Sequence, residues 1–260
     1  MKLVFITGGS SGIGQALAQA YLAQGWRVAV VARRLDSLQS WAAQTAAQLS
    51  LSGGRIGVFC ADVQHPDSII AAAELCIAQM GLPDVVIANA GISMGVDTAE
   101  REDLAVMRQV MDTNVLGMAA TFHPFIRGMQ TRGSGALVGI ASVAGIRGLP
   151  GHAAYCASKA ATISYCESLR GELRASGVQV ITLAPGYVAT PLTARNRYPM
   201  PFLMKADDFA RQAVKTIARG TSYRVIPWPM GVVAKLLRLL PNALFDRVLR
   251  GQPRKHRHSD

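Results

Sequence analysis

Short apolar segments of strand length recur along the chain and alternate with longer segments whose apolar residues fall at helical spacing. The predicted strands cover Leu3–Thr7, Arg27–Ala32, Arg55–Cys60, Asp84–Ala88, Ala136–Ile140, Val178–Ala184 and Arg224–Pro227. The predicted helices lie between them, over Gly12–Gln24, Ser37–Leu49, Asp67–Met80, Leu104–Met129, Ala153–Ala175 and Asp207–Arg219. This alternation predicts an α/β fold, in which a doubly wound parallel sheet of seven strands carries helices on both faces.

The run Val85-Val86-Ile87-Ala88 is apolar without alternation, which is typical of a strand that is covered on both faces. Ligands bind at the carboxyl ends of the strands in sheets of this kind, so residues that follow the strands are the candidates for a site. No repeat, low-complexity linker or shift in composition interrupts the chain before about Pro227. We therefore predict one domain over residues 1–228 and an extension over residues 229–260.

The extension has apolar residues at helical spacing on both sides of Pro241-Asn242, which predicts two short amphipathic helices. The apolar residues are Val232, Val233, Leu236, Leu237, Leu240, Leu244, Phe245, Val248 and Leu249. The basic residues mostly occupy other positions, and they are Lys235, Arg238, Arg247 and Arg250. The sequence leaves two alternatives open. The apolar stripe either covers the sheet edge and the mouth of a pocket, or it lies on an anionic membrane.

Composition excludes several classes of protein. Half of the residues are hydrophobic and 17% are charged, so burial can offset the entropy cost of ordering the chain. No apolar run reaches the roughly 18 residues of a spanning helix, and the first apolar run is too short for a signal peptide. The four cysteines lack C-x-x-C spacing and lie in apolar segments, which indicates a reducing, cytoplasmic location. Apart from His256 and His258 in the basic tail, the histidines show no metal-ligand spacing, so no metal site is predicted.

The formal net charge of +11 raises the question of a polyanionic partner. The last 34 residues contain seven Lys or Arg against two Asp, so much of the excess lies in the extension and its basic tail, Arg254–His258. The basic residues lack interleaved aromatic residues and no nucleic-acid-binding motif is present. We therefore do not expect nucleic acid as a partner.

A glycine-rich turn connects the first predicted strand to the first predicted helix. Glycines let the backbone turn sharply and approach a pyrophosphate, and the free N–H groups at the start of the helix favour its negative charge. The strand–turn–helix setting therefore predicts a dinucleotide site. Its residues are Thr7, Gly8, Ser10, Ser11, Gly12, Ile13 and Gly14.

The T-G-x-x-x-G-x-G spacing of this turn resembles that of the short-chain dehydrogenase/reductase family, which has a Rossmann-type fold. From about residue 3 to 227, further family motifs follow in the same order and setting. They are Asn89-Ala90-Gly91, Asn114, Ser142, the Y-x-x-x-K motif from Tyr155 to Lys159, Pro185-Gly186, Val188 and Thr190. The resemblance implies catalysis by Asn114, Ser142, Tyr155 and Lys159. It also implies that the residues after the strands, together with Tyr155 and Lys159, bind a dinucleotide.

Tyr155 and Lys159 are four residues apart on a predicted helix and so share one face. A free tyrosine titrates near about 10, and a neighbouring ammonium favours the phenolate, so we expect Lys159 to lower the pKa of Tyr155. The resemblance implies that Ser142 holds the substrate oxygen and that Asn114 joins a water-mediated proton relay through Lys159. Taken singly, these residues are also compatible with a surface tyrosine, a solvated lysine, a serine cap and a core asparagine.

The choice of cofactor depends on residues that follow the second and third strands. Arg33-Arg34 stands where an acidic residue would hold a ribose 2′-hydroxyl, and arginine offers a planar fork for a 2′-phosphate. Ser11 in the glycine turn adds a hydroxyl. Asp62 and Val63 resemble the family's adenine contacts, with an N-terminal helix charge as the alternative for Asp62. We therefore expect NADP(H).

The substrate is the least defined part of the prediction. Leu192–Met204 matches the position of the family's mobile substrate lid and combines Arg195, Arg197 and Tyr198 with apolar residues. Apolar pocket walls are expected from Met94, Ile146 and Leu149. These residues indicate a hydrophobic ketone or alcohol.

Together, these features predict an NADP(H)-dependent oxidoreductase that interconverts a carbonyl and a secondary alcohol. The alternative is a catalytically silent NADP(H)-binding sensor or membrane-associated scaffold. A homodimer is compatible with the sequence. A tetramer is not expected, because the chain continues well past the seventh strand, where the tetramer-forming branch of the family ends.

Overall fold

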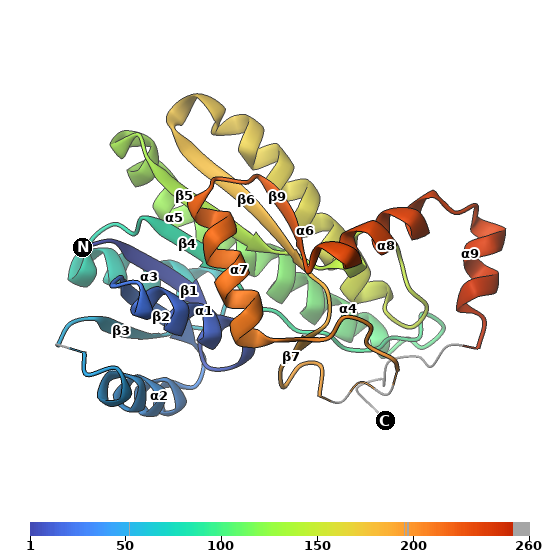
Figure 1. The fold of residues 1–260 in the computed structure, drawn as a ribbon, viewed down its shortest axis with the longest axis horizontal. Helices are drawn as coiled ribbons and strands as arrows, with labels where there is room; N and C mark the ends of the chain where they lie inside the picture. Colours follow the sequence, from blue (N-terminus) through green and yellow to red (C-terminus); the bar gives the residue numbers. More distant parts are fainter. Residues whose placement is uncertain (52, 195, 197, 252–260) are drawn as a thin grey trace.

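The computed structural model describes residues 1–251 apart from 52, 195 and 197. Its centre is a parallel seven-stranded sheet with the order β3-β2-β1-β4-β5-β6-β9 (Figure 1). The strands are β1 (Leu3–Thr7), β2 (Arg27–Ala32), β3 (Ile56–Cys60), β4 (Val85–Ala88), β5 (Gly135–Ile140), β6 (Val178–Pro185) and β9 (Tyr223–Ile226). The predicted doubly wound sheet and its single domain are confirmed, with strand ends within one residue of the prediction.

Helices cover both faces of the sheet (Figure 1). They are α1 (Gly12–Ala23), α2 (Leu35–Gln48), α3 (Pro66–Met80), α4 (Asp103–Met111), α5 (Gly117–Arg132), α6 (Ala153–Glu172), α7 (Ala206–Ala218), α8 (Trp228–Leu239) and α9 (Asn242–Leu249). Successive strand residues point to opposite faces. In β1, Val4 and Ile6 therefore pack with residues of α1, α2 and α7. Leu3 and Phe5 pack with residues of α3, α5 and α6. Both faces are apolar because both are covered.

Two features of the fold differ from the prediction. The helix predicted over Leu104–Met129 is divided into α4 and α5 by a π-helical turn, Asp112–Leu116. Two residues of β7 (Val188–Ala189) pair with β8 (Met204–Lys205) outside the main sheet. Neither feature has a periodicity that a sequence pattern can reveal, because each is only a few residues long.

The C-terminal helices extend from the end of β9 (Figure 1). Met230 and Ala234 of α8 are buried, with Met230 packed against Val225 of β9, and α9 buries Phe245. Apolar residues that remain exposed on the two helices are Trp228, Val232, Val233, Leu236, Leu239, Leu244 and Val248. The domain boundary between residues 228 and 229 stays a prediction. Among the described residues, no helix is long and apolar enough to span a bilayer.

Candidate active site

The glycine turn after β1 is packed tightly against the end of β4. Gly8 has a φ of +69°, and a Cβ there would lie 2.9 Å from Asn89 Nδ2. A Cβ on Gly14 would lie 2.2 Å from the carbonyl oxygen of Gly8. Only glycine fits at either position without moving the backbone. The turn therefore holds its shape through close backbone packing at these two glycines.

Thr7 and Asn89 connect the turn to the neighbouring strand. Thr7 Oγ1 accepts hydrogen bonds from the backbone N–H groups of Asn89 and Ala90, at 3.1 and 3.2 Å. Asn89 Nδ2 donates to the carbonyl oxygens of Thr7 and Gly8, at 3.0 and 3.3 Å. These bonds join the carboxyl ends of β1 and β4, where strand order reverses in the sheet. The site of a bound ligand is expected at such a point.

A cavity of about 440 Å³ lies at these strand ends. The predicted cofactor residues that line it are Gly8, Ser10, Ser11, Gly12, Ile13, Arg33, Arg34, Asp62, Val63, Asn89, Ala90, Gly91, Tyr155, Lys159, Pro185, Gly186, Val188 and Thr190. Thr7 and Gly14 support the turn from behind. Residues that sequence reasoning missed also line the cavity, among them Thr113, Ile140 and Ala141. Because none of them belongs to a recognisable motif, no sequence pattern marks them.

These residues fit a nicotinamide dinucleotide. The N-cap residue of α1, Ser11, makes no side-chain capping hydrogen bond, so the first-turn N–H groups carry no capping side chain beside the cavity. Helix N-termini of this kind bind phosphate groups. The closely packed glycines leave room for a pyrophosphate next to the backbone. The turn would therefore hold the pyrophosphate, and the residues after β2 and β3 would hold the adenosine half.

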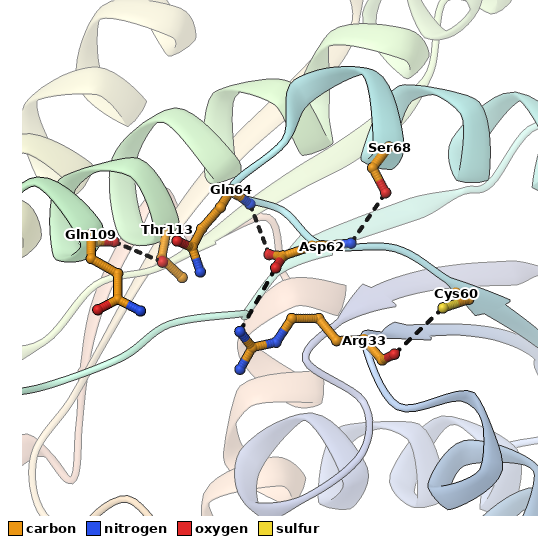
Figure 2. A network of polar contacts seen from close by, with 7 residues as sticks. All are labelled: Arg33, Cys60, Asp62, Gln64, Ser68, Gln109 and Thr113. Carbon is orange, nitrogen blue, oxygen red and sulfur yellow. Dashed lines mark hydrogen bonds and ion pairs between the residues drawn. The ribbon is translucent and has the colours of Figure 1, made fainter.

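Arg33 and Asp62 lie opposite each other just past the ends of β2 and β3 (Figure 2). Arg33 Nη1 is 3.7 Å from Asp62 Oδ2, and the two side chains are 62% and 28% exposed. Gln64 N donates to Asp62 Oδ1 at 3.0 Å, and Asp62 N donates to Ser68 Oγ at 3.2 Å. These hydrogen bonds, from the loop and from the start of α3, fix the position of Asp62. The long, exposed ion pair contributes little to stability, which leaves the guanidinium of Arg33 able to turn toward another anion.

Ser142, Tyr155 and Lys159 come together where β5 ends and α6 begins. Ser142 starts a 3-10 turn (Val143–Gly145), and its Oγ accepts a hydrogen bond of 3.2 Å from Ala144 N. Tyr155 and Lys159 lie one turn apart on α6, with Lys159 Nζ 5.7 Å from the centroid of the Tyr155 ring. Lys159 is buried, and its Nζ donates to the carbonyl oxygen of Ile140 at 2.9 Å. The end of β5 therefore fixes the ammonium beneath the tyrosine.

Burial shifts the pKa values of both Tyr155 and Lys159. Burial raises the pKa of Tyr155 above its ordinary value, and a side-chain hydrogen bond with Ser142 only partly opposes the rise. Burial lowers the pKa of Lys159 to about 8. The predicted lowering of the Tyr155 pKa is therefore wrong: burial raises this pKa, and the group that opposes the rise is Ser142. Tyr155 is protonated at neutral pH, as a proton donor must be.

Asn114 lies in the π-helical turn, and its side chain is fully engaged. Its Oδ1 accepts from Ile92 N at 2.8 Å, and its Nδ2 donates to Ile92 O and Ser158 Oγ, both at 2.9 Å. The side chain therefore ties the chain after β4 to α6, which carries Tyr155. Asn114 does not line the cavity, and its predicted part in a proton relay stays a prediction.

A second cavity, of about 350 Å³, is also lined by Ser142 and Tyr155. It shares Ser142, Tyr155, Gly186, Leu192 and Thr193 with the first cavity. Most of its remaining wall is apolar, and the residues are Ser93, Val143, Ala144, Leu149, Pro150, His152, Tyr187, Asn196, Tyr198, Pro199 and Leu249. Ser142 and Tyr155 thus line both cavities.

The predicted pocket walls are only partly correct. Leu149 lines the second cavity, but Met94 packs with Val96 and Val106, and Ile146 packs with Val225 and Met230. The last two predictions were wrong because both side chains turn into separate apolar clusters.

Residues of the predicted lid line the second cavity between Leu192 and Pro199, whereas Arg195 and Arg197 lie outside the described residues. Sequence reasoning missed His152, whose Nε2 lies 3.4 Å from the hydroxyl oxygen of Tyr198. Burial raises the pKa of Tyr198 to about 12. The cavity therefore combines an apolar wall with polar side chains, His152 and Tyr198 among them.

Comparison with known proteins identifies the family of the chain. Residues 2–200 match the family described as short chain dehydrogenase. An uncharacterized oxidoreductase of Myxococcus xanthus is 40% identical over 249 residues, which is 96% of each chain. The cis-4-hydroxycyclohexanecarboxylate dehydrogenase of Sinomonas cyclohexanicum is 32% identical over 218 residues, 84% of each chain. A crystal structure of a short-chain dehydrogenase from Streptomyces avermitilis has a TM-score of 0.78 at 23% identity, covering 96% of this chain and 99% of that one. The chain belongs to the short-chain dehydrogenase family, whose members are oxidoreductases that use a nicotinamide cofactor.

Proposed function

We propose that the protein is an NADP(H)-dependent oxidoreductase that interconverts a carbonyl group and a secondary alcohol on a hydrophobic substrate. The observation that carries the proposal is that Ser142 and Tyr155 line both cavities. A dinucleotide in the first cavity and a substrate in the second would then share one pair of hydroxyl groups. The apolar wall of the second cavity favours a hydrophobic substrate.

In the proposed reduction, Tyr155 donates a proton to the substrate oxygen. Ser142 donates a hydrogen bond to the same oxygen and holds it in place. The ammonium of Lys159 stabilises the negative charge that Tyr155 acquires, and with a pKa of about 8 it is charged at neutral pH. When bound, the cofactor supplies the hydride. In the reverse direction, Tyr155 accepts the proton from the alcohol.

The choice of NADP(H) rests on Arg33 and Arg34, which both line the first cavity. A guanidinium binds phosphate through charge-assisted hydrogen bonds, so the pair favours a 2′-phosphate over a free 2′-hydroxyl. Asp62 lies next to Arg33, and hydrogen bonds with Gln64 N and Ser68 Oγ hold it in place. It would remain available to accept from the adenine amine when Arg33 turns to the phosphate.

The proposal is tested by following NADPH oxidation with aldehydes and ketones of increasing chain length. We expect turnover with at least one carbonyl compound, and efficiency that rises with chain length until the apolar cavity is filled. The alternative function, a catalytically silent NADP(H) sensor or membrane-associated scaffold, predicts NADPH binding by fluorescence without oxidation in any reaction. NADPH binding alone, across the whole series, would favour that alternative.

We also propose peripheral contact with an anionic membrane, as a property compatible with either function. Seven apolar residues of α8 and α9 are exposed: Trp228, Val232, Val233, Leu236, Leu239, Leu244 and Val248. The exposed charged residues on these helices are Lys235, Arg238, Arg247 and Arg250 against Asp246. This charge complements anionic lipid, and each basic residue contributes about 1 kcal/mol near such a surface. The basic tail, Arg254–His258, lies outside the described residues.

Vesicle co-sedimentation tests the membrane proposal. We expect the full-length protein to sediment with anionic vesicles at low salt and to dissociate as salt rises, because salt screens the attraction. It should not sediment with neutral vesicles. The double variant Leu236→Glu/Leu239→Glu should lose binding, whereas Leu75→Glu, at an exposed position on α3, should bind like the wild type. Full-length protein that stays in solution with anionic vesicles at low salt would eliminate the proposal.

A further inference from the structure

Arg147 links the catalytic region to the C-terminal helices. It follows the 3-10 turn that begins after Ser142, and its guanidinium reaches the junction between α8 and α9. Nη1 donates to the carbonyl oxygens of Leu237 and Leu240, the latter at 2.7 Å. Nη2 donates to Asn242 Oδ1 at 3.1 Å. One side chain therefore satisfies carbonyl groups at the end of α8, which have no partners within the helix, and contacts the first residue of α9.

The same guanidinium also packs on an aromatic ring of α9. The Cζ atom of Arg147 lies 3.7 Å from the centroid of the Phe245 ring, within the distance of a cation–π contact. Phe245 is 6% exposed, whereas its neighbours Leu244 and Asp246 are exposed. The contact with Arg147 therefore lies on the buried face of α9, which faces the body of the protein.

That face of α9 carries a residue of the second cavity. Leu249 lies four residues after Phe245, which places both side chains on one face of the helix. Leu249 is half-buried and lines the second cavity together with Leu149 and Leu192. Val248, one residue earlier, is 55% exposed and does not line it. The C-terminal extension thus contributes to the wall of the cavity in which we place the substrate.

We propose that Arg147 is a positioning residue that holds α9 against the substrate cavity, and that Leu249 thereby limits the length of apolar substrate that the cavity accepts. This inference rests on the proposed function. It gives the extension a defined task in substrate selection, because α9 contributes to a cavity whose other walls come from the segments after β4, β5 and β6 and from α6.

The length limit is tested with straight-chain methyl ketones of increasing length and NADPH. Leu249→Ala removes three side-chain carbons from the wall, so the best ketone should become longer by roughly two carbons, and kcat/KM for longer ketones should rise about tenfold. Leu249→Trp should shift the optimum to shorter ketones. Val248→Ala and Val248→Trp are the matched controls and should keep the wild-type optimum. An unchanged optimum in both Leu249 variants would overturn the proposal.

The positioning role is tested with Arg147→Met, which keeps an unbranched side chain and removes every donor. We expect the KM of long ketones to rise by roughly tenfold, while kcat for a short ketone stays within about twofold. Arg147→Lys keeps the charge but not the fork, so it should fall between the wild type and Arg147→Met. An unchanged KM for long ketones in Arg147→Met would contradict the role of Arg147.

Hydrogen exchange distinguishes a failure of this inference from a failure of the proposed function. In Arg147→Met, the amides of α9 should exchange about tenfold faster or more, with the amides of α6 unchanged. This measurement needs no turnover. If neither the wild type nor any variant reduces a ketone, the proposed function fails. Accelerated exchange in α9 would even then support the role of Arg147 in holding α9. Unchanged exchange in α9 of Arg147→Met would overturn the proposed role of Arg147, whether or not the protein is active.

Discussion

Replacing Tyr155 with phenylalanine is expected to lower kcat for carbonyl reduction by about a hundred- to ten-thousandfold, the usual contribution of a general acid. Tyr155 lines both cavities, and the pKa of its hydroxyl is raised by burial, so at neutral pH it carries the proton that the substrate oxygen needs. The affinity for NADPH should change little, because the proposed partner of the hydroxyl is the substrate. The two quantities are measured by steady-state kinetics and by titration of NADPH fluorescence.

Two further variants make this result specific. Tyr165→Phe, on the same helix and also half-buried, removes a tyrosine hydroxyl away from both cavities and should leave turnover unchanged. Lys159→Ala should reduce turnover and also weaken NADPH binding, because Lys159 lines the first cavity. Turnover close to the wild-type value in Tyr155→Phe would refute the proposed proton transfer.

We expect the wild-type protein to prefer NADPH over NADH, measured as the ratio of the two kcat/KM values. In the double variant Arg33→Ala/Arg34→Ala this ratio should fall by about ten- to a hundredfold. A hydrogen bond to a charged group contributes about 1.5–3 kcal/mol, so one good contact with the 2′-phosphate accounts for this range. NADH efficiency should change little, because NADH has no 2′-phosphate. The measurement is kcat/KM for each cofactor with the same carbonyl substrate.

The control must separate a local contact from the general effect of positive charge. Arg174→Ala/Arg219→Ala removes the same charge at exposed positions outside the first cavity, so it should retain the preference. A parallel loss in this control would attribute the preference to long-range attraction. Equal efficiency of the wild-type protein with NADPH and NADH would refute the assignment of the cofactor.

Local patterns in the sequence were sufficient to predict the order and type of most helices and strands. Strands such as Leu3–Thr7 and Val85–Ala88 are apolar on both faces, and the helices between them have one apolar face, so burial alone specifies their order and type. The division of Leu104–Met129 was not predictable in this way. The π-helical turn places the Asn114 side chain on Ile92 and Ser158, and these partners are distant in sequence.

The sequence by itself also determined many of the residues that surround the first cavity, because glycines, arginines and the Y-x-x-x-K spacing follow strand ends that a parallel sheet brings to one edge. Only the tertiary structure decided the protonation of Tyr155, since desolvation depends on every element packed around it. The place of Arg147 was decided in the same way. Its acceptors include backbone carbonyls about 90 residues away, and a carbonyl group has no side-chain identity that a sequence could display.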